Sequence, residues 1–215
     1  MAETEGREAT PADFFEAMYQ GAAGGQLTLP WHRPVPHPLL LDWVGKRAVT
    51  GSGRRAVVVG CGLGVDAEYV AGLGFDTTAF DVSETAVSLA RREHPDSAVT
   101  YTTADLLDLP KEWLGAFDLV VEIYTVQALP DPPRADAIAS VGRLVGEGGT
   151  LLAIAFVGDE YKNGGIPPWP LTRAEVDALA TGVLIPVDIE MLTYSGAPGP
   201  GPAADRLWRA EFRRD

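Results

Sequence analysis

Apolar residues fall into short unbroken runs that alternate with stretches in which they recur every three or four positions. The first run, residues 56–59, is alanine followed by three valines, a pattern typical of a strand buried on both faces. Four more runs of strand character occupy residues 76–80, 99–103, 117–122 and 151–157. The last two predicted strands, 183–192 and 206–212, have no helix between them, which indicates a hairpin with an antiparallel final strand. The pattern predicts an α/β sandwich of about seven strands.

The segment before the first strand has its own pattern. Thr10 and Pro11 resemble an N-cap followed by proline at the first helical position, which predicts a helix to about residue 20. Residues 21–38 are rich in glycine and proline and indicate a loop, and residues 39–44 a second helix. We expect a single domain over residues 1–215, in which residues 1–50 cap a ligand site and residues 51–215 form the core.

Three glycines follow the first strand at alternate positions, and an acid ends the second. Gly60 and Gly62 allow the backbone to approach a ligand, and a helix that begins near Leu63 offers its free N–H groups to an anionic group. Asp81 is placed to accept hydrogen bonds from the hydroxyls of a ribose. The dinucleotide spacing G-x-G-x-x-G is not met, because Val65 stands at the third glycine position and Gly64 comes one residue earlier.

Charge and cysteine content narrow the class of protein. The net charge of −13 disfavours a nucleic-acid partner, because such a chain repels phosphate backbones. Cys61 is the single cysteine, so an internal disulfide is excluded. No apolar run is long enough to predict a membrane span, and acids stand near the N-terminus where a signal peptide carries Lys or Arg. These features predict a cytoplasmic protein; they do not predict its oligomeric state.

Five motifs in order resemble the class I S-adenosylmethionine-dependent methyltransferases: VVVGCGLG, FDVS, ADLLDLP, FDLVVE and LVGEGGTLLA. The resemblance implies a three-layer α/β/α sandwich with a Rossmann-like, mostly parallel sheet in the order 3-2-1-4-5-7-6, its last strand antiparallel. It implies S-adenosyl-L-methionine as cofactor, S-adenosyl-L-homocysteine as product and a small molecule as methyl acceptor. The cofactor residues that it implies are Trp31, Gly60, Cys61, Gly62, Asp81, Val82, Asp105, Leu106, Glu122 and Ile123.

The parts of the cofactor are assigned to these residues by the same resemblance. The two glycines of the turn border the methionine part, and Asp81 holds the ribose. Asp105 and Leu106 border the adenine. Glu122 and Ile123, at the end of the fourth strand, meet the methionine end through the backbone or the carboxylate.

Outside the core, Pro30-Trp31 and the segment GIPPWPLTRAEVDAL are similar to the thiopurine S-methyltransferase-like group. This narrower resemblance implies a thiol or another soft nucleophile as acceptor; O- or N-methylation of a small aromatic metabolite is the alternative. Phe14 and Met18 stand where that group commonly has tryptophan. The predicted substrate residues are Phe14, Tyr124, Gln127, Tyr161 and Trp169, with Trp31 as a further pocket wall.

Methyl transfer from a sulfonium is an in-line displacement that needs no metal, and the three histidines, His32, His37 and His94, lack ligand partners at suitable spacing. We therefore interpret all three as surface residues and predict no metal site. No catalytic residue is assigned, and the candidates for a general base are Glu122, Asp159, Glu160 and His37. Trp43 and Trp113 are predicted to serve packing. A non-catalytic cofactor-binding protein stays an alternative, whereas a nicotinamide dehydrogenase is disfavoured by Val65.

Overall fold

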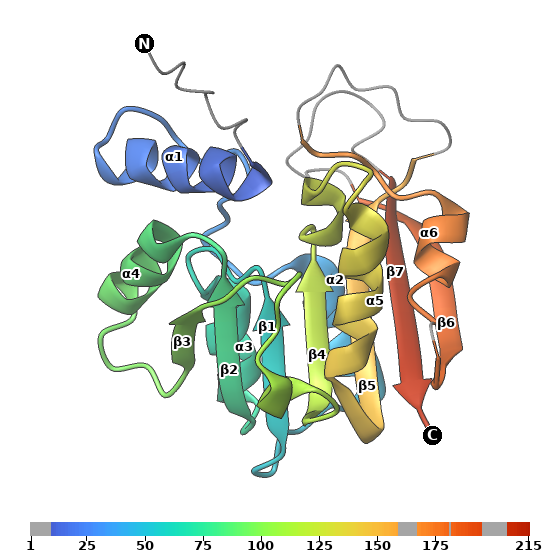
Figure 1. Ribbon diagram of the computed structural model, residues 1–215. Helices are drawn as coiled ribbons and strands as arrows, with labels where there is room; N and C mark the ends of the chain where they lie inside the picture. The colour runs from blue at the N-terminus through green and yellow to red at the C-terminus, as the bar shows by residue number, and fades with distance from the viewer. Residues whose placement is uncertain (1–9, 159–166, 181, 195–205) are drawn as a thin grey trace.

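A single seven-stranded sheet organises the computed structural model, which describes residues 10–158, 167–180, 182–194 and 206–215 (Figure 1). Its strands are β1 Arg55–Val59, β2 Asp76–Asp81, β3 Thr100–Thr103, β4 Phe117–Ile123, β5 Val145–Phe156, β6 Leu184–Thr193 and β7 Arg206–Arg214. The helices are α1 Pro11–Ala23, α2 Pro38–Arg47, α3 Val65–Gly72, α4 Glu84–Glu93, α5 Arg134–Leu144 and α6 Arg173–Asp177, with short 3₁₀ turns η1 Lys111–Trp113 and η2 Val126–Ala128.

The strand order is β3-β2-β1-β4-β5-β7-β6, and β7 runs antiparallel to both of its neighbours. This confirms the predicted order and the antiparallel last strand. Within the parallel part, Val59 is paired with Phe80 on one side and with Glu122 on the other. The carboxyl ends of β1, β2 and β4 therefore meet at one edge of the sheet, where ligands bind in open α/β sheets.

Helices cover both faces of the sheet and complete the three-layer sandwich (Figure 1). The apolar side chains of α5 and α6 pack on one face with those of β4, β5 and β7. The opposite face is covered by α2, α3 and α4. Trp43 is buried in this second cluster and Trp113 packs against the first, which confirms the packing role predicted for both. None of the described helices combines the length and apolar character that a membrane crossing requires.

The helix starts follow their caps. Thr10 and Asp13 form a capping box at α1, and Ser83 caps α4 through its hydroxyl. One predicted start was early. Gly64 adopts the left-handed conformation (φ +88°), so α3 begins after it at Val65. Helix α5 begins at Arg134, after two prolines, because residues that precede a proline are disfavoured in the α conformation.

Candidate cofactor and acceptor site

The glycine turn lies between β1 and α3, and its backbone requires glycine. Gly60, Gly62 and Gly64 all have positive φ values, between +53° and +88°. A Cβ on Gly60 would lie 2.2 Å from the Thr125 hydroxyl oxygen, and one on Gly64 would lie 2.2 Å from the Tyr101 hydroxyl oxygen. The turn is therefore a cradle that admits no side chain at these two positions.

Asp81 lies beside this cradle and is tied to it. Its carboxylate accepts hydrogen bonds from the backbone N–H of Gly62 at 2.9 Å and of Ser83 at 3.0 Å. The residue is 7% exposed. Burial raises the pKa of Asp81, and the backbone N–H groups act in the opposite direction. Two N–H bonds leave lone pairs free on a carboxylate, so Asp81 can still accept bonds from ligand hydroxyls.

Helix α1 lies over the turn and brings in a residue that the sequence motifs did not identify. Tyr19 is 4% exposed, and a Cβ added to Gly62 would lie 3.0 Å from its hydroxyl oxygen. Trp31 donates a hydrogen bond from Nε1 to this oxygen at 3.0 Å, and its ring meets Tyr19 edge-on. Trp31, a predicted cofactor residue, thus reaches the turn through Tyr19. The available signal for Tyr19 was its place on the apolar face of α1, which marks packing and ligand contact alike.

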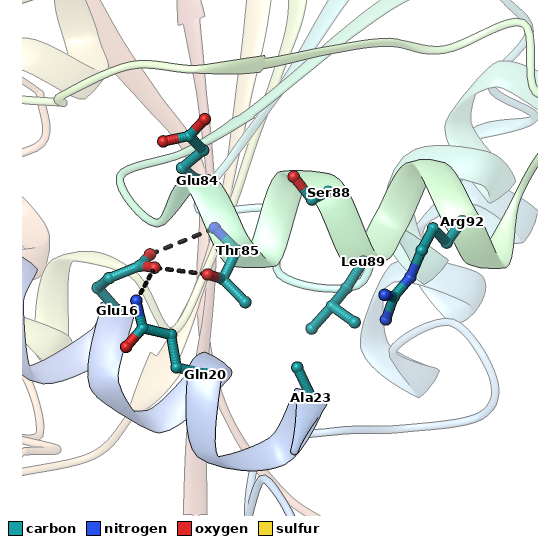
Figure 2. A pocket seen from close by; sticks show the side chains of 8 residues that line it. All are labelled: Glu16, Gln20, Ala23, Glu84, Thr85, Ser88, Leu89 and Arg92. Atoms are coloured by element: carbon teal, nitrogen blue, oxygen red, sulfur yellow. Dashed lines mark hydrogen bonds between the residues drawn. The ribbon is translucent and has the colours of Figure 1, made fainter. Parts of the chain in front are cut away.

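Glu16 fastens α1 to the start of α4. Its carboxylate accepts hydrogen bonds from the Ser83 hydroxyl at 2.6 Å, the Thr85 hydroxyl at 2.5 Å and the Thr85 N–H at 3.2 Å. These bonds lower the pKa of Glu16 against the opposing effect of burial. Figure 2 shows the contact of Glu16 with Thr85, between the two helices. These residues line a pocket of about 310 Å³. The cavity is lined by Glu16, Gln20, Ala23, Glu84, Thr85, Ser88, Leu89 and Arg92.

The predicted adenine residues follow β3. Leu106 is buried, whereas Asp105 is exposed and accepts a hydrogen bond from the N–H of Leu107 at 2.8 Å. Val82 and Cys61 are both partly exposed at the same edge of the sheet. Burial and the neighbouring Asp81 charge raise the pKa of the Cys61 thiol, so it stays protonated.

Glu122 ends β4 with its side chain fully buried. One carboxylate oxygen accepts hydrogen bonds from the N–H groups of Thr125 at 2.6 Å and Val126 at 3.0 Å, which shapes the turn η2. The other oxygen, Oε2, has no partner within the described part of the chain. Burial raises the pKa of Glu122 to about 7, with the two backbone N–H groups acting against it. Ile123, the next residue, is partly exposed.

His37 is buried at 1% exposure, so its prediction as a surface residue is wrong. It caps α2, and its Nε2 lies 2.9 Å from the hydroxyl oxygen of Tyr124. Tyr124 has a left-handed backbone (φ +66°) and stacks on Phe156, with 4.7 Å between ring centroids. His94 is partly exposed and bonds the carbonyl of Leu63, so only His32 is exposed as predicted. No group of three metal-ligand side chains occurs among the described residues.

Of the remaining predicted substrate residues, Gln127 and Trp169 are in contact, whereas Phe14 lies on α1. Gln127 is 1% exposed and accepts a hydrogen bond from the N–H of Phe156 at 2.7 Å, while its carbonyl accepts one from the N–H of Trp169. Phe14 is 38% exposed on α1, edge-on to Phe15. Tyr161, together with the candidate bases Asp159 and Glu160, lies outside the described residues.

Comparison with known proteins gives a family for the central part of the chain. Residues 56–149 match the family model described as "Methyltransferase domain". The ubiquinone biosynthesis O-methyltransferase of Thiobacillus denitrificans is 34% identical over 138 residues, covering 58% of this chain and 58% of that protein. The corresponding enzyme of Bordetella avium is 32% identical over 138 residues and covers 58% and 56%. The chain thus spans little more than half the length of these curated relatives.

Solved structures extend the likeness to the whole fold. A SAM-dependent methyltransferase from Anabaena variabilis superposes with a TM-score of 0.77 at 14% identity, over 100% of this chain and 99% of that one. The N-methyltransferase NodS from Bradyrhizobium japonicum, in complex with S-adenosyl-L-homocysteine, gives 0.68 at 18% identity, over 91% and 97%. The two curated relatives are O-methyltransferases and do not support the thiopurine-like group. Residues 56–149 thus match a methyltransferase domain, and the chain has the fold of the class I S-adenosylmethionine-dependent methyltransferases.

Proposed function

We propose that this chain transfers a methyl group from S-adenosylmethionine to an oxygen of a small molecule, most simply a phenolic hydroxyl. The observation that carries the proposal is the turn at Gly60, Gly62 and Gly64, with the Asp81 carboxylate bonded to the N–H of Gly62 beside it. The choice of oxygen, rather than the thiol expected from the sequence, rests on the relatives named as O-methyltransferases.

The residues at the carboxyl edge suit the cofactor. Gly60 and Gly62 carry no side chain, so the cofactor can approach the backbone of the turn. Asp81 has free lone pairs that can accept hydrogen bonds from two ribose hydroxyls. Asp105 and Leu106 lie after β3, where we propose that the adenine binds. When bound, the cofactor supplies a sulfonium methyl group that is ready for displacement.

This chain's own task would be to orient the acceptor and exclude water. Helix α1 covers the cradle through Tyr19, and we propose that it is the part of the residue 1–50 cap that lies over the cofactor. In contrast, α2 packs in the helical layer of the sheet and gives the cap a fixed end. Holding the nucleophile, methyl carbon and sulfur in line can contribute roughly 7–11 kcal/mol to lowering the barrier in favourable cases.

Two measurements on the full chain test the proposal. Isothermal titration calorimetry with S-adenosylhomocysteine is expected to show binding, and no heat at millimolar ligand would exclude the cofactor. Methyl transfer is then followed with catechol, thiophenol and aniline as oxygen, sulfur and nitrogen acceptors. We expect turnover with catechol, and transfer to thiophenol alone would return the assignment to a sulfur methyltransferase. Binding without transfer to any of the three would favour the non-catalytic alternative.

A further inference from the structure

We propose that His37 is a positioning residue that directs the Tyr124 hydroxyl outward, as a hydrogen-bond donor to an uncharged oxygen of the methyl acceptor. The inference rests on the proposed function and adds the kind of group that the acceptor presents to the protein. It begins with the polar cluster around His37, defined by Arg33, His37, Asp66 and Tyr124.

The backbone determines which nitrogen of His37 carries the proton. His37 precedes Pro38 at the start of α2, and its Nδ1 accepts a hydrogen bond from the N–H of Leu39 at 3.1 Å. A neutral imidazole that accepts at one nitrogen donates at the other. Nε2 therefore donates to the Tyr124 oxygen, 2.9 Å away. The backbone N–H of His37 also donates to Asp66 at 2.7 Å, which fixes the backbone from which the ring extends.

Neither ring of the pair ionises near neutral pH. Burial and the adjacent Arg33 charge lower the pKa of His37 to about 3. Burial raises the pKa of Tyr124, and Arg33 only partly opposes it. The pair is consequently a hydrogen-bond chain with one direction, in which the oxygen of Tyr124 accepts from His37 and its proton is left to donate elsewhere. His37, a candidate base from the sequence, is by this account unable to take a proton from the acceptor.

Two of the charged groups that face the pair, Arg33 and Asp66, form an ion pair. Arg33 pairs with Asp66 at 2.5 Å and lies over the Tyr124 ring, 5.9 Å from its centroid. The other ionisable groups that act on Tyr124 are Tyr194, which follows β6, and Glu122 on β4. An ion pair and neutral rings would recognise the acceptor by hydrogen bonding and shape, and they would give little preference to an acceptor that carries a charge. A phenol or carbonyl oxygen on a neutral ring meets this requirement.

The position of Tyr124 supports contact with a ligand. It comes directly after β4, at the edge where β1 and β2 end in the glycine turn and Asp81. Its left-handed backbone is unusual for a residue with a bulky side chain, and such strained positions gather at functional sites. Phe156, at the end of β5, stacks on its ring, and Tyr194 lies 6.2 Å from His37 between ring centroids. Of these rings, Tyr124 and Tyr194 are partly exposed, and under this proposal they meet a flat acceptor.

A double-mutant cycle with catechol as acceptor tests the inference. His37→Asn keeps a side chain that caps α2 but cannot reach Tyr124, and Tyr124→Phe removes the hydroxyl alone. We expect each variant to lower kcat about tenfold, the double variant to be no worse than Tyr124→Phe, and S-adenosylhomocysteine affinity to stay within twofold. His37→Gln, which retains a donor, is expected to recover kcat to within about threefold of wild type. Additive losses, or an equal loss in His37→Gln, would overturn the positioning role.

A second measurement does not depend on turnover. Long-range ¹H–¹⁵N correlation spectra of the full-length protein report the tautomer of each histidine, and His37→Asn identifies the signal of interest. We expect His37 to be neutral and protonated at Nε2 from pH 5 to pH 9. A proton on Nδ1, or a doubly protonated ring in that range, would refute the inference even in an active enzyme. If the protein did not bind the cofactor but His37 were still protonated at Nε2, the proposed function would be wrong while the direction of the His37–Tyr124 hydrogen bond would stand.

Discussion

Replacing Asp81 with asparagine separates ligand recognition from the packing of the site. The carboxylate sits at the end of β2, accepts two backbone N–H bonds and is almost wholly buried. Asparagine has the same shape but one acceptor oxygen, so its NH₂ group faces either the Gly62 or the Ser83 N–H. We expect Asp81→Asn to weaken cofactor binding and, to a smaller degree, to destabilise the fold.

The size of the effect follows from the bonds at stake. Hydrogen bonds to a charged acceptor contribute about 1.5–3 kcal/mol, so loss of the charged contact to the ribose raises the Kd about 10- to 150-fold. A buried N–H left without a partner costs about 1–3 kcal/mol of folding free energy. The two effects are distinguished by measuring binding well below the Tm of the variant.

Calorimetry with S-adenosylhomocysteine gives the affinity, and urea unfolding gives the stability. Asp76→Asn is the matched control, because Asp76 begins the same strand at the opposite edge and is exposed. We expect this control to bind like wild type. If folded Asp81→Asn bound the ligand with a Kd within twofold of wild type, Asp81 would not hold the ribose and the cofactor placement would be wrong.

Three further predictions concern the turn, the buried acid and the cap. Gly64→Ala is expected to destabilise the protein by about 2–4 kcal/mol in urea unfolding, because its Cβ would clash with Tyr101 and φ is positive. The control is Gly72→Ala at the end of α3, where a Cβ meets no atom. We expect this control to be neutral or to stabilise the protein by up to about 1 kcal/mol. The raised pKa of Glu122 means that the folded state binds its proton more tightly than the unfolded state. Stability therefore falls as pH rises from about 4.5 to about 7, by about 3 kcal/mol, and Glu122→Gln removes that fall. Glu16→Ala is expected to destabilise the protein by about 1–3 kcal/mol and to speed proteolysis within α1, because its bonds to the buried Ser83 hydroxyl and to Thr85 are lost.

Each of these has a result that contradicts it. Equal stability of the two glycine variants would mean that the turn tolerates a side chain. If the difference in stability between wild type and Glu122→Gln were the same at pH 8 as at pH 5, ionisation of Glu122 would not destabilise the fold. Unchanged proteolysis of α1 in Glu16→Ala would show that the helix is held by its apolar contacts alone.

Local patterns were sufficient for the elements and for part of the site. Runs of valine and leucine predicted the buried strands, because strands of a parallel sheet are apolar on both faces. Thr10 and Pro11 predicted the start of α1, because an N-cap satisfies free N–H groups next to it in the chain. Gly60, Gly62 and Asp81 were identified by spacing, and the structure places them together because consecutive parallel strands end at one edge.

Only the tertiary structure decided which side chains meet from distant segments. Nothing in the sequence near His37 shows that it is buried, since its partner Tyr124 lies 87 residues away. The same holds for Tyr19 over Gly62, which depends on where α1 lies across the sheet edge. The spacing of apolar residues and the caps of a helix or strand depend on residues that are neighbours in the sequence. The packing of these elements depends instead on many weak contacts between distant parts of the chain. The residues that we propose for the cofactor were therefore predictable from the sequence, whereas the contact between His37 and Tyr124 required the fold.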